Sequence, residues 1–257
     1  MTDTVAENKR GILEECQNRA ITVKHLPFYY HVHLNMPCNQ RCIMCVPDGK
    51  HARDLLPFDK FLAFFEQVKL YAEHITLIGG EPLMYPWIDS VLEFLAQQRI
   101  TVTINTNATM LKGALAEKVL SLHEVFLKCS IDAVTPLTYH KIRGTDWFER
   151  VTDNLKTFSL LARDMSHVHL ELMYVVMREN LHEVLPFIDF AKTLRPYCVQ
   201  FQPVKHVTHW HTTNGTGWVF DGQEQSCEFF RDEYNDVLSH AAEKCVREGL
   251  KYEVQLV

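Results

Sequence analysis

Short apolar runs alternate with longer amphipathic stretches along most of this chain. The apolar runs are rich in β-branched and aromatic residues and are bounded by polar residues, Gly or Pro, so each predicts a β-strand. These runs are Tyr29–Asn35, His74–Ile78, Ile100–Asn105, Val125–Ile131, His167–Val176 and Tyr197–Gln202. The stretches between them repeat apolar residues at helical spacing and predict helices. They are Phe58–Tyr71, Trp87–Gln98, Leu111–Leu122, Asp146–Ala162 and Leu181–Leu194.

Repeated strand–helix units predict an α/β fold with a parallel sheet across residues 29–205. Residues 1–28 predict a helical segment, which either packs under the sheet or recruits a partner. Residues 206–257 predict a short appendage of a loop, a helix around Phe229–Glu248 and a strand-like end at Lys251–Val257. We therefore expect three segments in the chain.

The composition excludes several classes of protein. With 257 residues and 47% hydrophobic residues, the chain can bury a substantial core as one large domain. Its formal net charge of −6 offers no basic surface, so we do not expect nucleic acid as a partner. No apolar run reaches the length of a membrane span, and the polar start Met1–Thr4 is unlike a signal peptide. These features, with clustered unpaired cysteines, favour a reducing cytoplasm.

Three cysteines, Cys38, Cys42 and Cys45, follow the first predicted strand at the spacing C-x3-C-x2-C. Thiolates this close converge on one metal centre, and an iron–sulfur cluster is its natural occupant. With three thiolates, one iron of a 4Fe-4S cluster keeps an open position, as a catalytic metal site requires. Zinc is the alternative, with His31 or His33 as its fourth ligand.

Further polar motifs stand where predicted strands end. Gly79-Gly80-Glu81-Pro82 ends the second strand, Thr106-Asn107 the third, and Ser130-Ile131-Asp132 the fourth. Catalytic residues of parallel barrels lie at the carboxyl ends of the strands. The cysteine loop has the same placement, so we expect these motifs to form one site.

With these motifs in this order, the sequence resembles the radical S-adenosylmethionine (radical SAM) enzymes. Their signature is C-x3-C-x-Φ-C, with Met44 here at the position Φ, and the Gly-Gly-Glu-Pro run resembles their GGEP motif. The segment Tyr139–Gly144 resembles the branch of the molybdenum-cofactor, sulfatase-maturing and SPASM-type peptide-modifying enzymes. The matches span about Tyr29 to Gln202. The resemblance implies a partial (β/α)6 barrel, one 4Fe-4S cluster, S-adenosylmethionine (SAM) and a one-electron reductant such as flavodoxin or ferredoxin.

The resemblance also implies which residues bind the cofactors. Cys38, Cys42 and Cys45 would hold the cluster. The residues implied to contact SAM are Met44, Gly79, Gly80, Glu81, Pro82, Asn107, Ser130, Asp132 and Arg143.

Each SAM group has an expected partner in this set. Ser130 and Arg143 would bind the carboxylate, and the Glu81 carboxylate or nearby carbonyls would accept from the ammonium. Met44 would pack near the adenine. Asp132 would either bind the ribose or cap the following helix. Ala108 departs from the commoner Thr-Asn-Gly, which leaves the role of this turn less defined.

The implied function is reductive cleavage of SAM to a 5′-deoxyadenosyl radical, which abstracts a hydrogen atom from a peptide or small-metabolite substrate. Cys198, Cys227 and Cys245 are widely spaced, so we predict no auxiliary cluster. Three alternatives stay open: a zinc-binding scaffold or regulatory domain, a degenerate SAM-binding protein, and the SAM-cleaving core of a longer SPASM-type enzyme. The catalytic residues that follow hydrogen abstraction are unknown, although Glu171 and Tyr174 could exchange protons inside the barrel.

Overall fold

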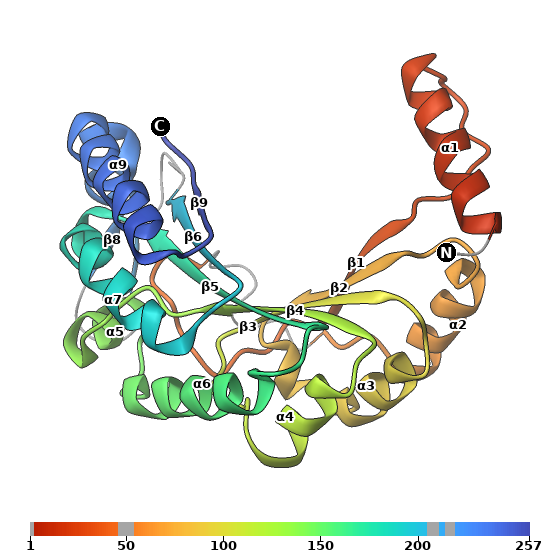
Figure 1. Ribbon diagram of the computed structural model, residues 1–257, viewed down its shortest axis with the longest axis horizontal. Coiled ribbons are helices and arrows are strands. Elements are labelled where there is room, and N and C mark those ends of the chain that lie inside the picture. The colour runs from red at the N-terminus through yellow and green to blue at the C-terminus, as the bar shows by residue number, and fades with distance from the viewer. Residues whose placement is uncertain (1–2, 46–53, 205–210, 214–218) are drawn as a thin grey trace.

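Seven parallel strands form one curved sheet within the described residues, in the order β1-β2-β3-β4-β5-β6-β9 (Figure 1). The computed structural model describes residues 3–45, 54–204, 211–213 and 219–257. The strands of the sheet are β1 (Tyr29–Asn35), β2 (His74–Gly79), β3 (Thr101–Thr106), β4 (Glu124–Ser130), β5 (Val168–Val176), β6 (Cys198–Pro203) and β9 (Tyr252–Val254). All neighbouring pairs are parallel, so the carboxyl ends of the strands meet at one edge.

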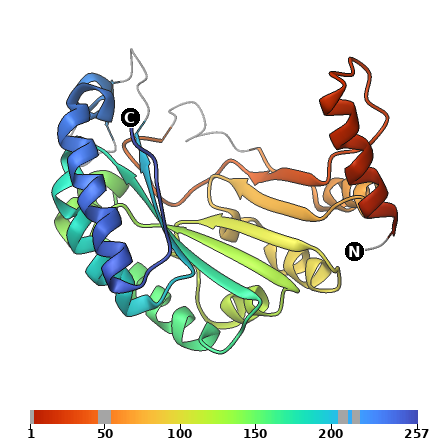
Figure 2. The same cartoon turned by 45° about the horizontal axis from the view of Figure 1, so that its top comes forward.

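Helices cover one face of the sheet and leave the other face concave (Figures 1 and 2). The helices are α1 (Asp3–Gln17), α2 (Phe58–Val68), α3 (Ile88–Ala96), α4 (Gly113–Leu120), α5 (Pro136–Arg143), α6 (Phe148–Ala162), α7 (Val184–Leu194), α8 (Gly222–Gln225) and α9 (Arg231–Glu248). Short 3-10 helices are η2 (Pro82–Met84), η3 (Arg178–Glu183) and η4 (Cys227–Phe230). A small antiparallel pair joins β7 (His211–Thr213) to β8 (Val219–Asp221).

The hydrophobic core lies between the sheet and these helices. Leu77 of β2 and Ile104 of β3 are fully buried, as are Val91 and Leu95 of α3, which all belong to one apolar cluster. Burying one such side chain stabilises the fold by about 1.5–3 kcal/mol. Alternate residues of a strand point to opposite faces of the sheet. The strand residues next to these core residues therefore point to the concave face.

The predicted elements are confirmed, with ends that differ by a few residues. All six predicted strands are present, and the strand-like end of the chain forms β9, which extends the same sheet beside β6. The fold is thus the expected α/β partial barrel with one more strand than the six of the prediction. The division at residues 28 and 205 stays a proposal.

Several elements, among them helix α5, the strands β7 and β8 and the four-residue helix α8, were missed by the sequence analysis. Helix α5 begins with Pro136 after the cap Thr135 and ends at Gly144, whose φ of 70° is left-handed. These are ordinary signals for the start and end of a helix, yet the segment was interpreted only as a cofactor motif.

The N-terminal helix α1 stands beyond the β1 edge of the sheet (Figures 1 and 2). The Asn8 side chain exchanges two hydrogen bonds with the backbone of Leu26, at 2.6 and 3.0 Å. Lys9 pairs with Glu73, just before β2, at 2.7 Å. The helix is therefore anchored near the amino ends of the strands, opposite the cysteine loop. None of the helices in the described ranges has both the length and the apolarity of a bilayer span.

Candidate functional site

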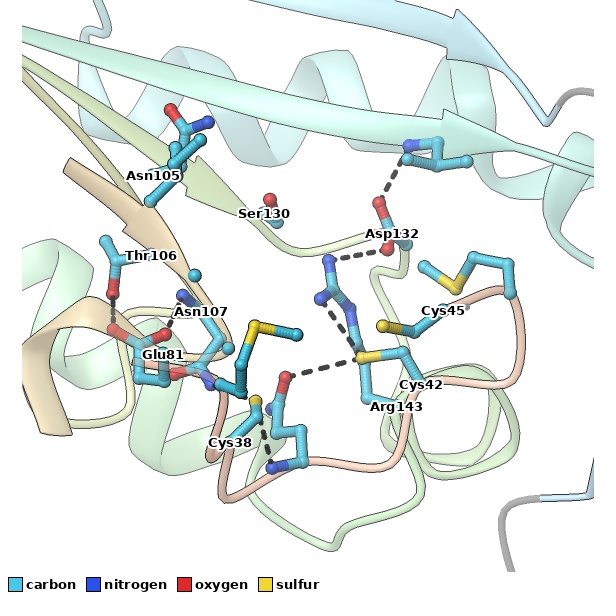
Figure 3. Close-up of a pocket in the computed structure, with 17 residues that line it drawn as sticks. Cys38, Cys42, Cys45, Glu81, Asn105, Thr106, Asn107, Ser130, Asp132 and Arg143 are labelled. Atoms are coloured by element: carbon cyan, nitrogen blue, oxygen red, sulfur yellow. Dashed lines mark hydrogen bonds and ion pairs between the residues drawn. The ribbon is translucent and has the colours of Figure 1, made fainter. Parts of the chain in front are cut away.

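A cavity of about 390 Å³ opens at the carboxyl ends of the strands, where the sequence places its motifs (Figure 3). Of the predicted site residues, those that line it are Cys38, Cys42, Met44, Cys45, Gly79, Gly80, Glu81, Asn107, Ser130, Asp132 and Arg143. Pro82 is not among them and instead begins the short helix η2. Thr106, from the motif at the end of the third strand, also lines the cavity, and the sequence analysis did not predict the other lining residues, which are Met36, Gln40, Ile78, Asn105 and Val175.

The carboxyl end of α5 holds the cysteine loop in place. The amide of Arg41 donates to the Arg143 carbonyl at 3.2 Å, and the amide of Ile43 donates to the Ile142 carbonyl at 2.8 Å. The last carbonyls of a helix have no partner inside the helix, so they are free to accept these bonds. Helix α5 thereby positions Cys42 as well as presenting Arg143.

The three thiols around the cavity differ in solvent exposure. Cys38 and Cys42 are partly buried and Cys45 is exposed. Burial raises the pKa of Cys38 to about 11, and burial also raises the pKa of Cys42 although Arg143 opposes that rise. A metal centre must therefore displace protons from these thiols when it binds.

The arrangement disfavours a zinc site. His31 and His33 are both exposed on β1, and neither lines the cavity with the cysteines. Across the described parts of the chain, no three Cys, His, Asp or Glu side chains are grouped closely enough to hold a single metal ion. Three thiols spaced around a cavity suit a larger cluster better than a single tetrahedral ion.

The two glycines of the GGEP motif make room for the neighbouring chain. A Cβ on Gly79, whose φ is 145°, would lie 2.0 Å from the Asn35 carbonyl oxygen. A Cβ on Gly80 would lie 2.1 Å from the Met36 carbonyl oxygen. The Gly80 amide donates to the Asn35 carbonyl at 2.7 Å. The sequence predicts that these glycines let a ligand approach the backbone closely. In the structure, the segment that leads into the cysteine loop makes such an approach.

The Glu81 carboxylate braces two strand ends and is almost fully buried. Its Oε1 accepts from the Thr106 hydroxyl at 2.6 Å and from the Leu83 amide at 3.1 Å. Its Oε2 accepts from the Asn107 amide at 2.7 Å. Burial raises the pKa of Glu81, and these three donors oppose the rise. With three protein donors bound, this carboxylate positions the site, and its contact with the SAM ammonium stays a prediction.

The Asn107 side chain connects the end of β3 to the cysteine loop. Its Nδ2 donates to the Asn39 Oδ1 at 2.8 Å and lies 3.7 Å from the Cys38 Sγ. Its Oδ1 accepts from the Thr109 amide at 3.0 Å. Ala108 is buried and has a φ of 60°, a backbone conformation that favours glycine. This position therefore departs from Thr-Asn-Gly in residue type but keeps the conformation of the turn.

Arg143 lies between Asp132 and Cys42, deep in the wall of the cavity (Figure 3). Its Nη2 is 2.5 Å from the Asp132 Oδ2, and its Nη1 donates to the Cys42 Sγ at 3.4 Å. The Asp132 Oδ1 accepts from the Val175 amide at 2.7 Å. The expectation that Asp132 caps the following helix was wrong, because Thr135 occupies that position. Its carboxylate is bound by protein groups, which favours positioning of Arg143 over ribose binding.

Arg143 and Ser130 bring hydrogen-bond donors to the cavity wall. The buried Arg143 Nε has no hydrogen-bond partner among the residues that the structure describes. The Ser130 side chain is half-buried and lines the same cavity. Unpaired buried donors are costly unless a ligand satisfies them, so this part of the wall suits an anionic group.

A polar cluster on the concave face was largely missed. The Lys128 Nζ lies 3.3 Å from the Glu171 Oε2, and the Gln200 Nε2 donates to the same oxygen at 3.1 Å. Lys128 is two residues before Ser130 and therefore on the same face of β4. Alternation of apolar and polar residues along β4 was the signal that could have found it. Glu171 points into the barrel, whereas Tyr174 is buried and donates to the Asn180 carbonyl.

A family model described as the Radical SAM superfamily matches residues 37–191, which is more than half of the chain. This chain belongs to the radical SAM superfamily. It is an enzyme of that class, and the family's members bind a 4Fe-4S cluster through three cysteines and use SAM. The predicted superfamily and cofactors are therefore confirmed.

Two curated relatives of this radical SAM chain share one name. A "Probable GTP 3′,8-cyclase" of Saccharolobus solfataricus is 29% identical over 164 residues, 63% of this chain and 52% of the relative. A protein of the same name from Methanocaldococcus jannaschii is 25% identical over 174 residues, 65% of this chain and 57% of the relative. The chain spans about half the length of the curated relatives it matches.

Solved structures share the fold. Streptococcus suis SuiB bound to S-adenosylmethionine matches with a TM-score of 0.73 and 15% identity, over 96% of this chain and 54% of SuiB. Native anSMEcpe with bound AdoMet and Cp18Cys peptide matches with a TM-score of 0.69 and 15% identity, over 89% of this chain and 63% of that chain. At this identity the likeness shows the radical SAM fold.

Proposed function

We propose that this radical SAM enzyme reductively cleaves SAM and abstracts a hydrogen atom from a peptide or small-metabolite substrate. The observation that carries the proposal is the convergence of the three cysteines, Ser130 and Arg143 on one cavity at the carboxyl ends of the strands. Sequence positions separated by about a hundred residues meet there, in the order of motifs that the family shares.

The residues of the cavity fit the cofactors on their own chemistry. Cys38, Cys42 and Cys45 would hold the cluster, and the Ser130 hydroxyl and the Arg143 guanidinium supply donors at the cavity that a carboxylate needs. When bound, the cluster supplies the electron that cleaves SAM to methionine and the 5′-deoxyadenosyl radical.

The protein's task is to position and shield the cofactors. Met44 packs against the apolar cluster at the cavity, beside the space where the adenine would lie. Glu81 and Asn107 keep the ends of β2 and β3 and the cysteine loop in register. The substrate C–H bond must be held close to the radical while water is excluded, which requires a wall of fixed side chains.

The concave face supports a polar substrate. Lys128, Glu171 and Gln200 lie on three successive strands, β4, β5 and β6, and alternation along β4 puts Lys128 on the same face as Ser130. This set can bind peptide amides or the charged groups of a metabolite. The solved neighbours SuiB bound to precursor peptide SuiA and anSMEcpe with bound Cp18Cys peptide favour a peptide. The GTP 3′,8-cyclase relatives make GTP the small metabolite to test beside it.

The remaining parts of the proposal concern the setting of the reaction. We expect flavodoxin or ferredoxin as the electron donor, a cytoplasmic location, and no nucleic acid as a partner. Because the chain spans about half of its curated relatives, the SAM-cleaving core of a longer SPASM-type enzyme stays the alternative. The deciding experiment measures 5′-deoxyadenosine formed by the iron-reconstituted protein under anaerobic conditions, in comparison with the Cys42→Ala variant.

A further inference from the structure

Arg143 bridges a cluster-binding cysteine and a buried carboxylate. Its two terminal nitrogens point in different directions, one 3.4 Å from the Cys42 Sγ and the other 2.5 Å from the Asp132 Oδ2. The side chain of Arg143 is 6% exposed and that of Asp132 is fully buried. Charges in such a place interact more strongly than on the surface, because little water screens them.

Asp132 is itself fastened to the sheet. Its carboxylate accepts from the Val175 amide at 2.7 Å, and its carbonyl accepts from the Asn180 Nδ2 at 3.0 Å. Its φ of 60° is rare for a residue other than glycine, so these bonds maintain a conformation that the free chain would avoid. Asp132 thus holds the guanidinium in one orientation.

The backbone of the same helix end fastens Cys42 from the other side. The carbonyl of Arg143 accepts from the Arg41 amide, and the carbonyl of Ile142 accepts from the Ile43 amide. The contact between guanidinium and thiol is therefore fixed at both ends, by the cysteine loop and by the β4–α5 connection. A contact held in this way persists while ligands enter and leave the cavity.

We propose that the Asp132–Arg143 pair raises the reduction potential of the cluster by donating a charge-assisted hydrogen bond to the Cys42 thiolate. This inference rests on the proposed function. Reduction adds one electron to a cluster already surrounded by thiolates, so a donor at one sulfur stabilises the reduced form more than the oxidised form. Asp132 is the positioning residue of the pair, and Arg143 makes the contact.

The pair has a second consequence for the radical SAM reaction. Arg143 would partly set the reduction potential at which SAM receives its electron. The same residue would also bind the SAM carboxylate. Its Nη1 contacts the Cys42 Sγ and its Nη2 lies beside the Asp132 carboxylate, so a carboxylate of SAM would share the guanidinium with these two groups.

The test is a reductive titration of the cluster-loaded protein without SAM. Dithionite with redox mediators delivers one electron per cluster, and the EPR signal of the reduced cluster reports the midpoint. The variant is the double substitution Asp132→Asn with Arg143→Gln, which removes one positive and one negative charge and leaves the net charge unchanged. The control is Arg41→Gln, which removes an exposed cation in the same loop.

The expected result is a midpoint shifted to more negative potential in the double variant, with a much smaller shift in Arg41→Gln. Equal midpoints for the wild type and the double variant, each with a full complement of iron, overturn the inference and leave the proposed function standing. A wild-type protein that binds no four-iron cluster removes the proposed function itself.

A second variant keeps the test usable if the double variant does not fold. Arg143→Lys preserves the charge beside Asp132, but one ammonium cannot keep the separate contacts of a guanidinium fork. We expect the same direction of shift, together with weaker SAM binding measured by calorimetry. A purely structural role of Arg143 would lower stability in both variants without moving the midpoint.

Discussion

The Thr106 hydroxyl donates to the Glu81 Oε1 at 2.6 Å, which joins the end of β3 to the end of β2. The Asn107 amide donates to the other oxygen of the same carboxylate at 2.7 Å. One buried side chain therefore sets the spacing of two adjacent strand ends in the wall of the radical SAM cavity. The GGEP motif resembles a ligand-binding signature, and here its glutamate accepts hydrogen bonds from other parts of the protein.

Glu81→Gln tests this brace. An amide keeps one acceptor oxygen but places an NH2 group against protein donors, and a buried unsatisfied donor costs about 1–3 kcal/mol. We expect the free energy of unfolding of the cluster-free protein to fall by that amount in urea titrations. Glu66→Gln, at an exposed position on α2, is the control and should change stability by less than about 0.5 kcal/mol. Equal effects of the two substitutions would show that Glu81 braces nothing.

Gly80→Ala tests the close packing of the GGEP motif. The new Cβ would lie 2.1 Å from a backbone oxygen, so the chain before the cysteine loop must move. Overpacking of this kind costs about 1–3 kcal/mol, and we also expect incomplete iron incorporation. The comparison is Gly113→Ala, where φ is 54° and the added Cβ meets no atom within 4 Å. That variant should lose stability but bind iron normally, and normal iron binding by both would contradict the account.

The pH dependence of Cys38 follows from its burial, which raises its pKa to about 11 from the ordinary 9.0. The thiol is protonated below this value, and thiolate appears only as the pH rises toward it. At pH 8 we expect Cys38 of the cluster-free protein to react with iodoacetamide about tenfold or more slowly than an ordinary thiol. Peptide mass spectrometry at several pH values measures the rate, with exposed Cys16 as the internal reference. A Cys38 rate that stops rising near pH 9 would contradict the assignment.

Lys128 and Glu171 form the next pair to test. Lys128→Met leaves a carboxylate that is 6% exposed with the Gln200 amide alone, and removing one partner of a buried pair is more costly than removing both. We expect the single substitution to lower the free energy of unfolding by about 1–3 kcal/mol. The double variant Lys128→Met with Glu171→Gln should recover part of that loss. If the changes in the free energy of unfolding simply add in the double variant, with no recovery, the two side chains do not interact.

Much of this fold follows from local sequence patterns. The strand β4 alternates apolar and polar residues, and α3 repeats apolar positions at helical spacing, so both could be predicted from one stretch of chain. The same reasoning placed the cysteines and Ser130 at strand ends, and parallel topology then brought them together. Local order and topology were enough to locate the cavity.

The roles of the polar residues were harder to predict, because they depend on partners distant in sequence. The contact of Glu81 with a ligand stays a prediction, but its hydrogen bonds to Thr106 and Asn107, 25 and 26 residues away, were not predicted. Asp132 does not cap the following helix, its binding of ribose stays a prediction, and its pairing with Arg143 and with the backbone of β5 was not predicted. A side chain's hydrogen bonds are set by tertiary packing, and no local pattern shows which donor will reach it.

The most direct measurement is the amount of 5′-deoxyadenosine formed from SAM. The protein is reconstituted with iron and sulfide under anaerobic conditions, mixed with dithionite and SAM, and compared with Cys42→Ala. The account predicts 5′-deoxyadenosine from the wild type and at least a 100-fold loss, about 2.7 kcal/mol in the barrier, in the variant. A wild-type protein that carries a full four-iron cluster yet forms no 5′-deoxyadenosine, or one that holds zinc and no iron, would contradict it.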